Sequence, residues 1–82
     1  MIERVTLNGI KRRGLAAWKG RERWAHRKVQ IWSGEHRAWW RAGGCGYVLT
    51  RDRAGVYDFA DAWEATKHCG PEKKIAFYPV TP

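Results

Sequence analysis

A short amphipathic helix with a marked start and stop constrains this sequence more than any other feature. Asp58 is placed to cap the free amides of the first turn, and Asp61 follows three residues later, as in a capping box. Gly70 is a natural left-handed residue for ending the helix, and Pro71 prevents its continuation. One helical face carries Phe59, Ala62, Trp63 and Thr66. The sequence therefore predicts a helix over about 59–69 whose apolar face packs on a sheet.

Runs of β-branched and aromatic residues on both sides of this helix predict short strands. They are Lys28–Trp32, Arg37–Arg41, Tyr47–Thr50 and Ile75–Val80, with a further short candidate at Arg4–Leu7. Because proline has no amide hydrogen, Pro79 favours a sheet edge for the last strand. We predict an α+β fold in which a small antiparallel sheet of about three to four strands packs on one helix in the C-terminal half.

The length of 82 residues leaves room for one core. Residues 28–82 are expected to form the α+β domain, and residues 1–27 a basic and less regular segment whose helical pattern is broken by Gly14 and Gly20. No apolar run approaches the roughly 20 residues that span a bilayer, and the first residues lack the apolar stretch of a secretory signal. We expect a cytoplasmic protein, with Cys45 and Cys69 as free thiols.

Positive charge and tryptophan are concentrated in the first half of the chain. The net charge of +8 falls entirely within residues 1–41, and so do Trp18, Trp24, Trp32, Trp39 and Trp40. Cationic side chains and flat aromatic faces suit binding to a polyanion. A domain this small also needs two or three tryptophans for its core, and we assign Trp32, Trp39 and Trp40 to the sheet and core. Trp18 and Trp24 are the candidates for an exposed role, although arginine stacked on tryptophan also occurs as an internal contact.

Catalytic and metal-binding patterns are weak. The single serine, Ser33, lies in a Ser-Gly turn without a nucleophile motif, and the two cysteines have no supporting motif either. His36, Cys45 and either His68 or Cys69 offer zinc ligands, but they lack the closely spaced pair of a structural zinc site. The carboxylates at the predicted helix are explained by capping and a solvated face, and the glycine-rich stretch 43–46 lacks the lysine of a phosphate-binding loop. We expect no catalytic residue, no metal and no cofactor; Cys69 is assigned to the apolar face of the helix and Cys45 to a tight turn.

A combination of motifs in the last 50 residues resembles short, uncharacterised bacteriophage and prophage proteins. They are Trp32-Ser33-Gly34-Glu35-His36-Arg37-Ala38-Trp39-Trp40-Arg41, Gly46-Tyr47, and Ala54-Gly55-Val56-Tyr57 leading into the helix with Ala62. The resemblance excludes the first 27 residues and brings no assigned chemistry. It implies a phage accessory protein, a class that includes anti-CRISPR proteins, and hence a bacterial host cell.

Two function classes follow from charge and resemblance. The first is a non-enzymatic, anti-CRISPR-like inhibitor that binds a CRISPR effector complex or its DNA or RNA and blocks target recognition; its charge excludes an acidic DNA mimic. The second is a stand-alone nucleic-acid-binding phage protein or regulator, and a small enzyme ranks third. The candidate binding residues are Arg12, Arg13, Trp18, Arg21, Arg23, Trp24, Arg27 and Lys28, with Arg37 and Arg41 as secondary positions.

Overall fold

Six short antiparallel strands form one sheet in the computed structural model, which describes residues 3–44 and 46–80. The strands are β1 (Val5–Thr6), β2 (Lys28–Ser33), β3 (Ala38–Trp40), β4 (Tyr47–Val48), β5 (Tyr57–Asp58) and β6 (Ile75–Pro79). Their order is β1-β6-β2-β3-β4, and β5 pairs with the first residues of β2. The predicted α+β class is confirmed, and every predicted strand is present, including the short one at the N-terminus.

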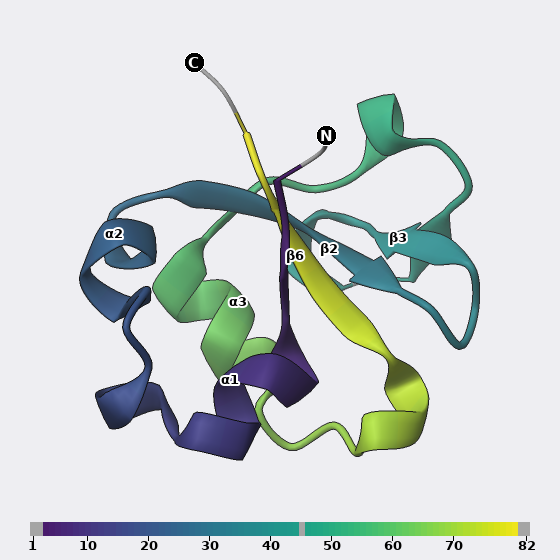
Figure 1. Cartoon of the computed structure of the whole chain (residues 1–82). Coiled ribbons are helices and arrows are strands. Elements are labelled where there is room, and N and C mark those ends of the chain that lie inside the picture. The colour runs from purple at the N-terminus through teal and green to yellow at the C-terminus, as the bar shows by residue number, and fades with distance from the viewer. Residues whose placement is uncertain (1–2, 45, 81–82) are drawn as a thin grey trace.

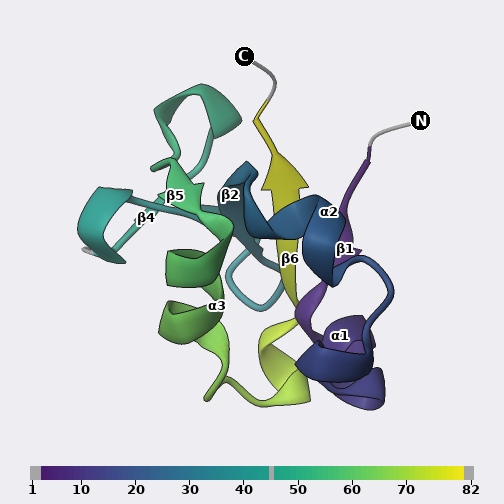
Figure 2. The same cartoon turned by 90° about the vertical axis from the view of Figure 1, so that its left-hand side faces the viewer.

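Three α-helices occur within the described residues: α1 (Leu7–Arg13), α2 (Arg21–Ala25) and α3 (Phe59–Thr66). Four 3-10 turns link the elements: η1 (Leu15–Ala17), η2 (Ala42–Gly44), η3 (Arg51–Arg53) and η4 (Pro71–Lys73). The helices gather on one side of the molecule and β3 lies on the other (Figure 1). Viewed from the helical side, α3 lies to one side of β6, and α1 and α2 lie to the other (Figure 2).

Helix α3 confirms the strongest prediction, with corrections at both ends. Asp58 occupies the N-cap position, but its carboxylate makes no hydrogen bond to the helix amides. It instead pairs with the Lys28 ammonium at 2.7 Å, because β2 and β5 place the two residues opposite each other. Gly70 is not left-handed: its φ is −75°, and it precedes the turn η4 rather than closing the helix.

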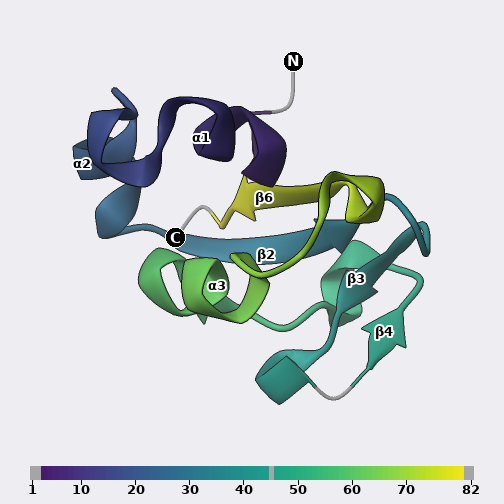
Figure 3. The ribbon, with the colours of Figure 1, turned by 90° about the horizontal axis from the view of Figure 1, so that it is seen from below.

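Alternation along β2 and β6 directs one face of the sheet into the core. Val29 and Ile31 on β2, and Ile75 and Phe77 on β6, are buried together with side chains of all three helices. Helix α1 contacts β6 and helix α3 contacts β2 (Figure 3). The helical members of this core are Leu7, Ile10, Trp24, Phe59 and Ala62. Residues 3–27 therefore contribute to the same core as the rest of the described chain.

The expected exposure of Trp24 is wrong, and Trp18 is only partly exposed. Trp24 is only 5% exposed, because α2 is turned so that the indole contacts Phe59, with ring centroids 6.1 Å apart. Trp18 is half-buried, with its ring 5.8 Å from Phe59 and 6.4 Å from Trp24. Trp40 packs against the core as predicted, whereas Trp32 and Trp39 lie on the opposite face of the sheet.

Strand β6 is not an edge strand, contrary to the expectation from Pro79. It lies between β1 and β2, and β1 pairs only with Ala76 and Phe77. Pro79 therefore extends beyond β1, on a side where no strand requires an amide hydrogen from it.

Gly55 and Tyr57, two residues of the sequence motifs described above, connect the segment before α3 to the segment after β3. The Gly55 amide donates to the Trp40 carbonyl at 2.9 Å, and a Cβ at position 55 would lie 2.3 Å from the Ala42 nitrogen. The Tyr57 hydroxyl donates to the Arg41 carbonyl and accepts from the Gly44 amide. Glycine and tyrosine at these positions are thus explained by packing and hydrogen bonding.

Candidate functional site

The first candidate site is the exposed basic surface of α1, η1 and α2. We define this helical surface by the exposed cations Arg12, Arg13, Lys19, Arg21 and Arg23. Helix α1 is capped by Thr6, whose hydroxyl accepts a hydrogen bond from the Gly9 amide at 3.1 Å, and it ends with Lys11, Arg12 and Arg13. Cations are favourable there because the C-terminal end of a helix carries partial negative charge.

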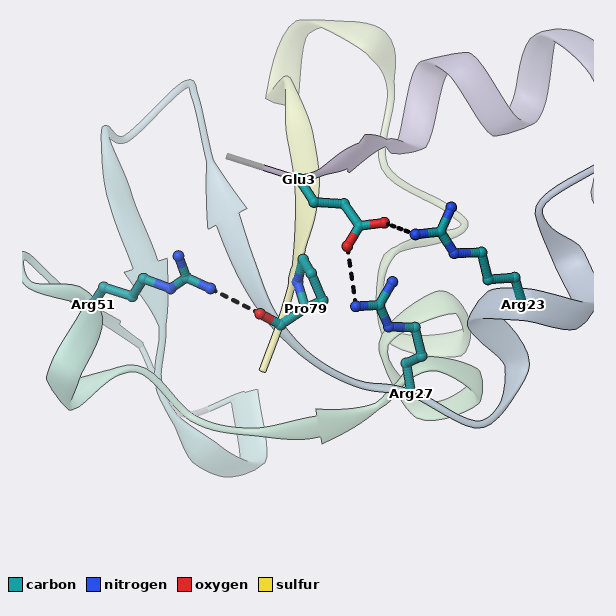
Figure 4. Close-up of polar contacts among 5 residues, drawn as sticks. All are labelled: Glu3, Arg23, Arg27, Arg51 and Pro79. Carbon is teal, nitrogen blue, oxygen red and sulfur yellow. Dashed lines mark hydrogen bonds and ion pairs between the residues drawn. The ribbon is translucent and has the colours of Figure 1, made fainter. Parts of the chain in front are cut away.

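Two of the predicted binding residues, Arg23 and Arg27, form ion pairs with Glu3 of the same chain. Glu3 accepts hydrogen bonds from Arg23 at 2.5 Å and from Arg27 at 3.1 Å, which ties the start of the chain to α2 (Figure 4). The bond from Arg27, with the nearby charges of both arginines, lowers the pKa of the Glu3 carboxyl below its ordinary value of 4.5. The Arg27 guanidinium also lies 4.7 Å from the centroid of Trp24.

Lys28 is likewise occupied, since its ion pair with Asp58 raises the pKa of its ammonium. Among the described residues, Arg12, Arg13, Lys19 and Arg21 make no ion pair, so their charge is directed to solvent. Of the residues predicted near the helices, Arg12, Arg13 and Arg21 are therefore unpaired among the described residues, Arg23 is partly engaged, and Trp24 is buried in the core. Lys19 joins this surface without having been predicted.

The secondary positions lie on a different part of the molecule. Arg37 is exposed in the turn between β2 and β3, where its φ is +51°. Arg41 follows β3, and its Nε donates to the Tyr47 carbonyl at 3.4 Å. Because β3 and the helices lie at opposite sides of the molecule (Figure 1), the structure does not bring Arg37 and Arg41 together with the helical surface.

The face of the sheet away from the core carries an aromatic row. We call this face of the sheet the open face. The register places Thr6, Ala76, Trp32, Trp39 and Val48 side by side across β1, β6, β2, β3 and β4. Trp32 and Trp39 meet edge to face with ring centroids 5.1 Å apart, and Trp39 lies 5.0 Å from Tyr78 in the same manner. All three rings are partly exposed.

Arg51 contacts this aromatic row, and it was not predicted from the sequence. Its Nε donates to Gln30 Oε1 at 2.7 Å, and its guanidinium donates to the Pro79 carbonyl at 3.0 Å (Figure 4). The same guanidinium lies 5.4 Å from the centroid of Trp39 and 5.2 Å from that of Tyr78. In the sequence, Arg51 belongs to a charged turn and has no local feature that distinguishes it from Arg53.

A surface hollow adjoins the open face at β4. It has a volume of about 420 Å³ and is lined by Arg41, Tyr47, Val48, Leu49, Thr50 and Arg53. Arg53 makes no ion pair within the described part of the chain, and no acidic residue lines the hollow. The walls combine two guanidinium groups with apolar side chains, an arrangement that suits an anionic ligand with a flat apolar part.

A separate groove of about 380 Å³ runs between α2 and α3 and is lined by Leu15, Arg21, Ala25, Phe59, Ala60, Trp63 and Glu64. Its lining is mainly apolar, with one charge of each sign at the sides. It carries no cluster of nucleophiles or acid–base pairs.

The side chains considered for catalysis make packing contacts and hydrogen bonds within the protein. Ser33 is buried, and its hydroxyl accepts a weak hydrogen bond from the His36 amide at 3.4 Å. His36 stacks on Tyr47 with ring centroids 4.4 Å apart. Cys69 packs partly buried against the core, but from the segment after α3 and not from the apolar face of the helix, which ends at Thr66; the expectation for Cys45 lies outside the described residues. Over residues 3–44 and 46–80, no three His, Cys, Asp or Glu side chains gather to hold a metal, and no helix is long and apolar enough to cross a membrane.

Fold and surface together define a small, basic α+β protein with two separate cationic regions. The chain matches no protein-family model, no curated protein and no solved structure. Its function is therefore argued from its own residues.

Proposed function

We propose that this protein is a non-enzymatic nucleic-acid-binding protein that contacts phosphates through the helical surface. The observation that carries the proposal is the exposure of Arg12, Arg13, Lys19 and Arg21 without acidic partners among the described residues. Free cations on one surface lower the free energy of a bound polyanion, because each phosphate contact releases condensed counterions.

The proposal predicts how steeply the binding constant falls as the salt concentration rises. Each phosphate neutralised on duplex DNA contributes about −0.9 to the slope of log K against log salt. If Arg12, Arg13, Lys19 and Arg21 each contact a phosphate, the expected slope is about −4. Arg23 adds less, because Glu3 already neutralises part of its charge.

Fluorescence anisotropy with a labelled duplex, titrated at several salt concentrations, measures this slope. The double variant R12Q/R13Q should reduce its magnitude by about 2 and weaken binding on every sequence tested. The matched control K67Q/K73Q removes the same charge from two lysines that pair with Glu64 and Glu35, and should leave the slope almost unchanged. Absence of binding to any nucleic acid at low salt would contradict the proposal.

A second candidate function is the anti-CRISPR-like inhibitor, in which the partner is a CRISPR effector complex in the bacterial cytoplasm. Exposed apolar side chains favour it: Leu49 is 82% exposed, Val56 50% and Tyr47 44%. Apolar side chains beside free arginines suit an acidic protein surface better than a bare phosphate backbone.

A pull-down from lysate containing the effector, with and without nuclease, separates the two functions. A nuclease-resistant complex that is weakened by L49D supports the inhibitor, because aspartate places a charge where an apolar contact is required. Recovery that disappears with nuclease supports direct nucleic-acid binding instead.

A further inference from the structure

We propose that the open face and its adjoining hollow bind a single-stranded nucleic acid, with bases on the tryptophans and a phosphate between Arg41 and Arg53. This inference rests on the proposed nucleic-acid binding and assigns it a second surface, distinct from the helical surface. Its basis is the row of aromatic rings on the open face, which meets at Val48 the guanidinium groups and apolar side chains that line the hollow.

The geometry begins with the strand register. Trp32, Trp39 and Val48 lie directly beside one another on β2, β3 and β4. Neighbouring strands are about 4.8 Å apart, so this row extends roughly 10 Å across the sheet. Arg41 follows Trp39 by two residues and lines the hollow together with Val48. The row of rings therefore leads directly into the hollow.

The residues of the hollow are suited to a phosphate. Arg53 is exposed and has no acidic partner among the described residues, and Arg41 uses only its Nε on the Tyr47 carbonyl. The terminal nitrogens of a guanidinium form two parallel bonds to phosphate oxygens. Tyr47 and Leu49 supply an apolar wall for a base or sugar.

The rings favour unpaired bases over a duplex. Bases inside a duplex are covered by their stacked neighbours, whereas splayed bases of a single strand stack on tryptophan, tyrosine or arginine planes. Arg51 is fixed by Gln30 and Pro79 and holds Trp39 and Tyr78 in place from one side. It is therefore a positioning residue, and Trp32 is the ring on this row that makes no contact with it.

The test compares two probes on two surfaces of the full-length chain: a fluorescein-labelled oligo-dT of eight nucleotides and a labelled duplex. We expect R41Q/R53Q to weaken oligo-dT binding about tenfold or more and duplex binding less than twofold. R12Q/R13Q, which removes equal charge from the helical surface, should show the reverse preference. W32L should weaken oligo-dT binding by about tenfold while its circular dichroism spectrum stays native.

The outcomes separate this inference from the proposed function. If R41Q/R53Q leaves oligo-dT affinity unchanged while R12Q/R13Q reduces it, the open face is not the site, and nucleic-acid binding through the helices stands. If neither probe binds the wild type at low salt, both proposals fail. A loss in R41Q/R53Q that W32L does not share overturns the stacking part, because charge alone would then account for the affinity.

Discussion

Replacing Trp24 by phenylalanine tests whether this residue belongs to the core or to a binding surface. The side chain is 5% exposed and contacts Phe59, Trp18 and Arg27. W24F removes three buried ring atoms, and at about 0.8 kcal/mol per buried methylene-sized group the free energy of unfolding should fall by about 2 kcal/mol. That loss is a substantial part of the roughly 5–15 kcal/mol that stabilises a domain.

The expected loss of unfolding free energy in W24F is large enough to measure and small enough to leave the variant folded. About 2 kcal/mol corresponds to a Tm lower by about 8–16 °C for a domain of this size, which leaves W24F folded at low temperature. W24A, expected to cost about 3–5 kcal/mol, carries a greater danger of unfolding and is the less informative variant. Urea unfolding followed by far-ultraviolet circular dichroism measures the change, with the m-value expected to stay constant.

Binding measurements on W24F complement the unfolding measurements. Under conditions where W24F is fully folded, its affinity for oligo-dT and duplex should equal that of the wild type, because the indole does not face a ligand. W32L provides the contrast, since Trp32 lies on the open face. Unchanged stability of W24F together with lost affinity would refute the burial argument and return Trp24 to the binding surface.

Three further predictions concern the fold that supports these surfaces. Because the folded pKa of Glu3 is lowered, its contribution is present above about pH 4.5 and is lost as the pH falls through the folded pKa; E3Q should be less stable than wild type at neutral pH, and this gap should close in acid urea titrations. T6A should cost about 1 kcal/mol by removing the cap on the Gly9 amide, while T6S should restore it in the same unfolding assay. G55A should cost about 1–3 kcal/mol, since its Cβ collides with the Ala42 backbone, and thermal unfolding with no loss of stability would contradict that packing.

The sequence predicted those parts of the fold that depend on local patterns. Helix α3 has a helical stripe, and β2 has both alternation and β-branched residues, so each was recognisable from its own residues, although α3 ends at Thr66, before the stop predicted at Gly70. Pairing between distant strands has no such local pattern. The position of β6 between β1 and β2 depends on contacts across more than 40 residues, and Pro79 alone therefore pointed to the wrong place.

The helices of the N-terminal region could not be predicted, because they are too short for a periodic stripe. Helix α2 has five residues, and Trp24 is its only buried side chain. Gly20 appeared to interrupt a helix, but a Cβ there would lie 2.6 Å from the Trp18 ring, so glycine allows that ring to fold back toward the core. A glycine two residues from a tryptophan was the only local indication of this packing.

The burial of Trp24 changes how charge and aromatic content relate to binding. In the sequence, arginine and tryptophan are interleaved through one half of the chain, which favours a single mixed surface. The fold separates them in part: α2 turns Trp24 inward and leaves Arg21 exposed, so the ring that remains partly exposed beside the helical cations is that of Trp18. Alternation along β2 directs Trp32 to the open face, where rings and arginines do occur together. A ligand that needs only phosphate contacts and one that needs stacking are therefore expected to use different sides of this protein.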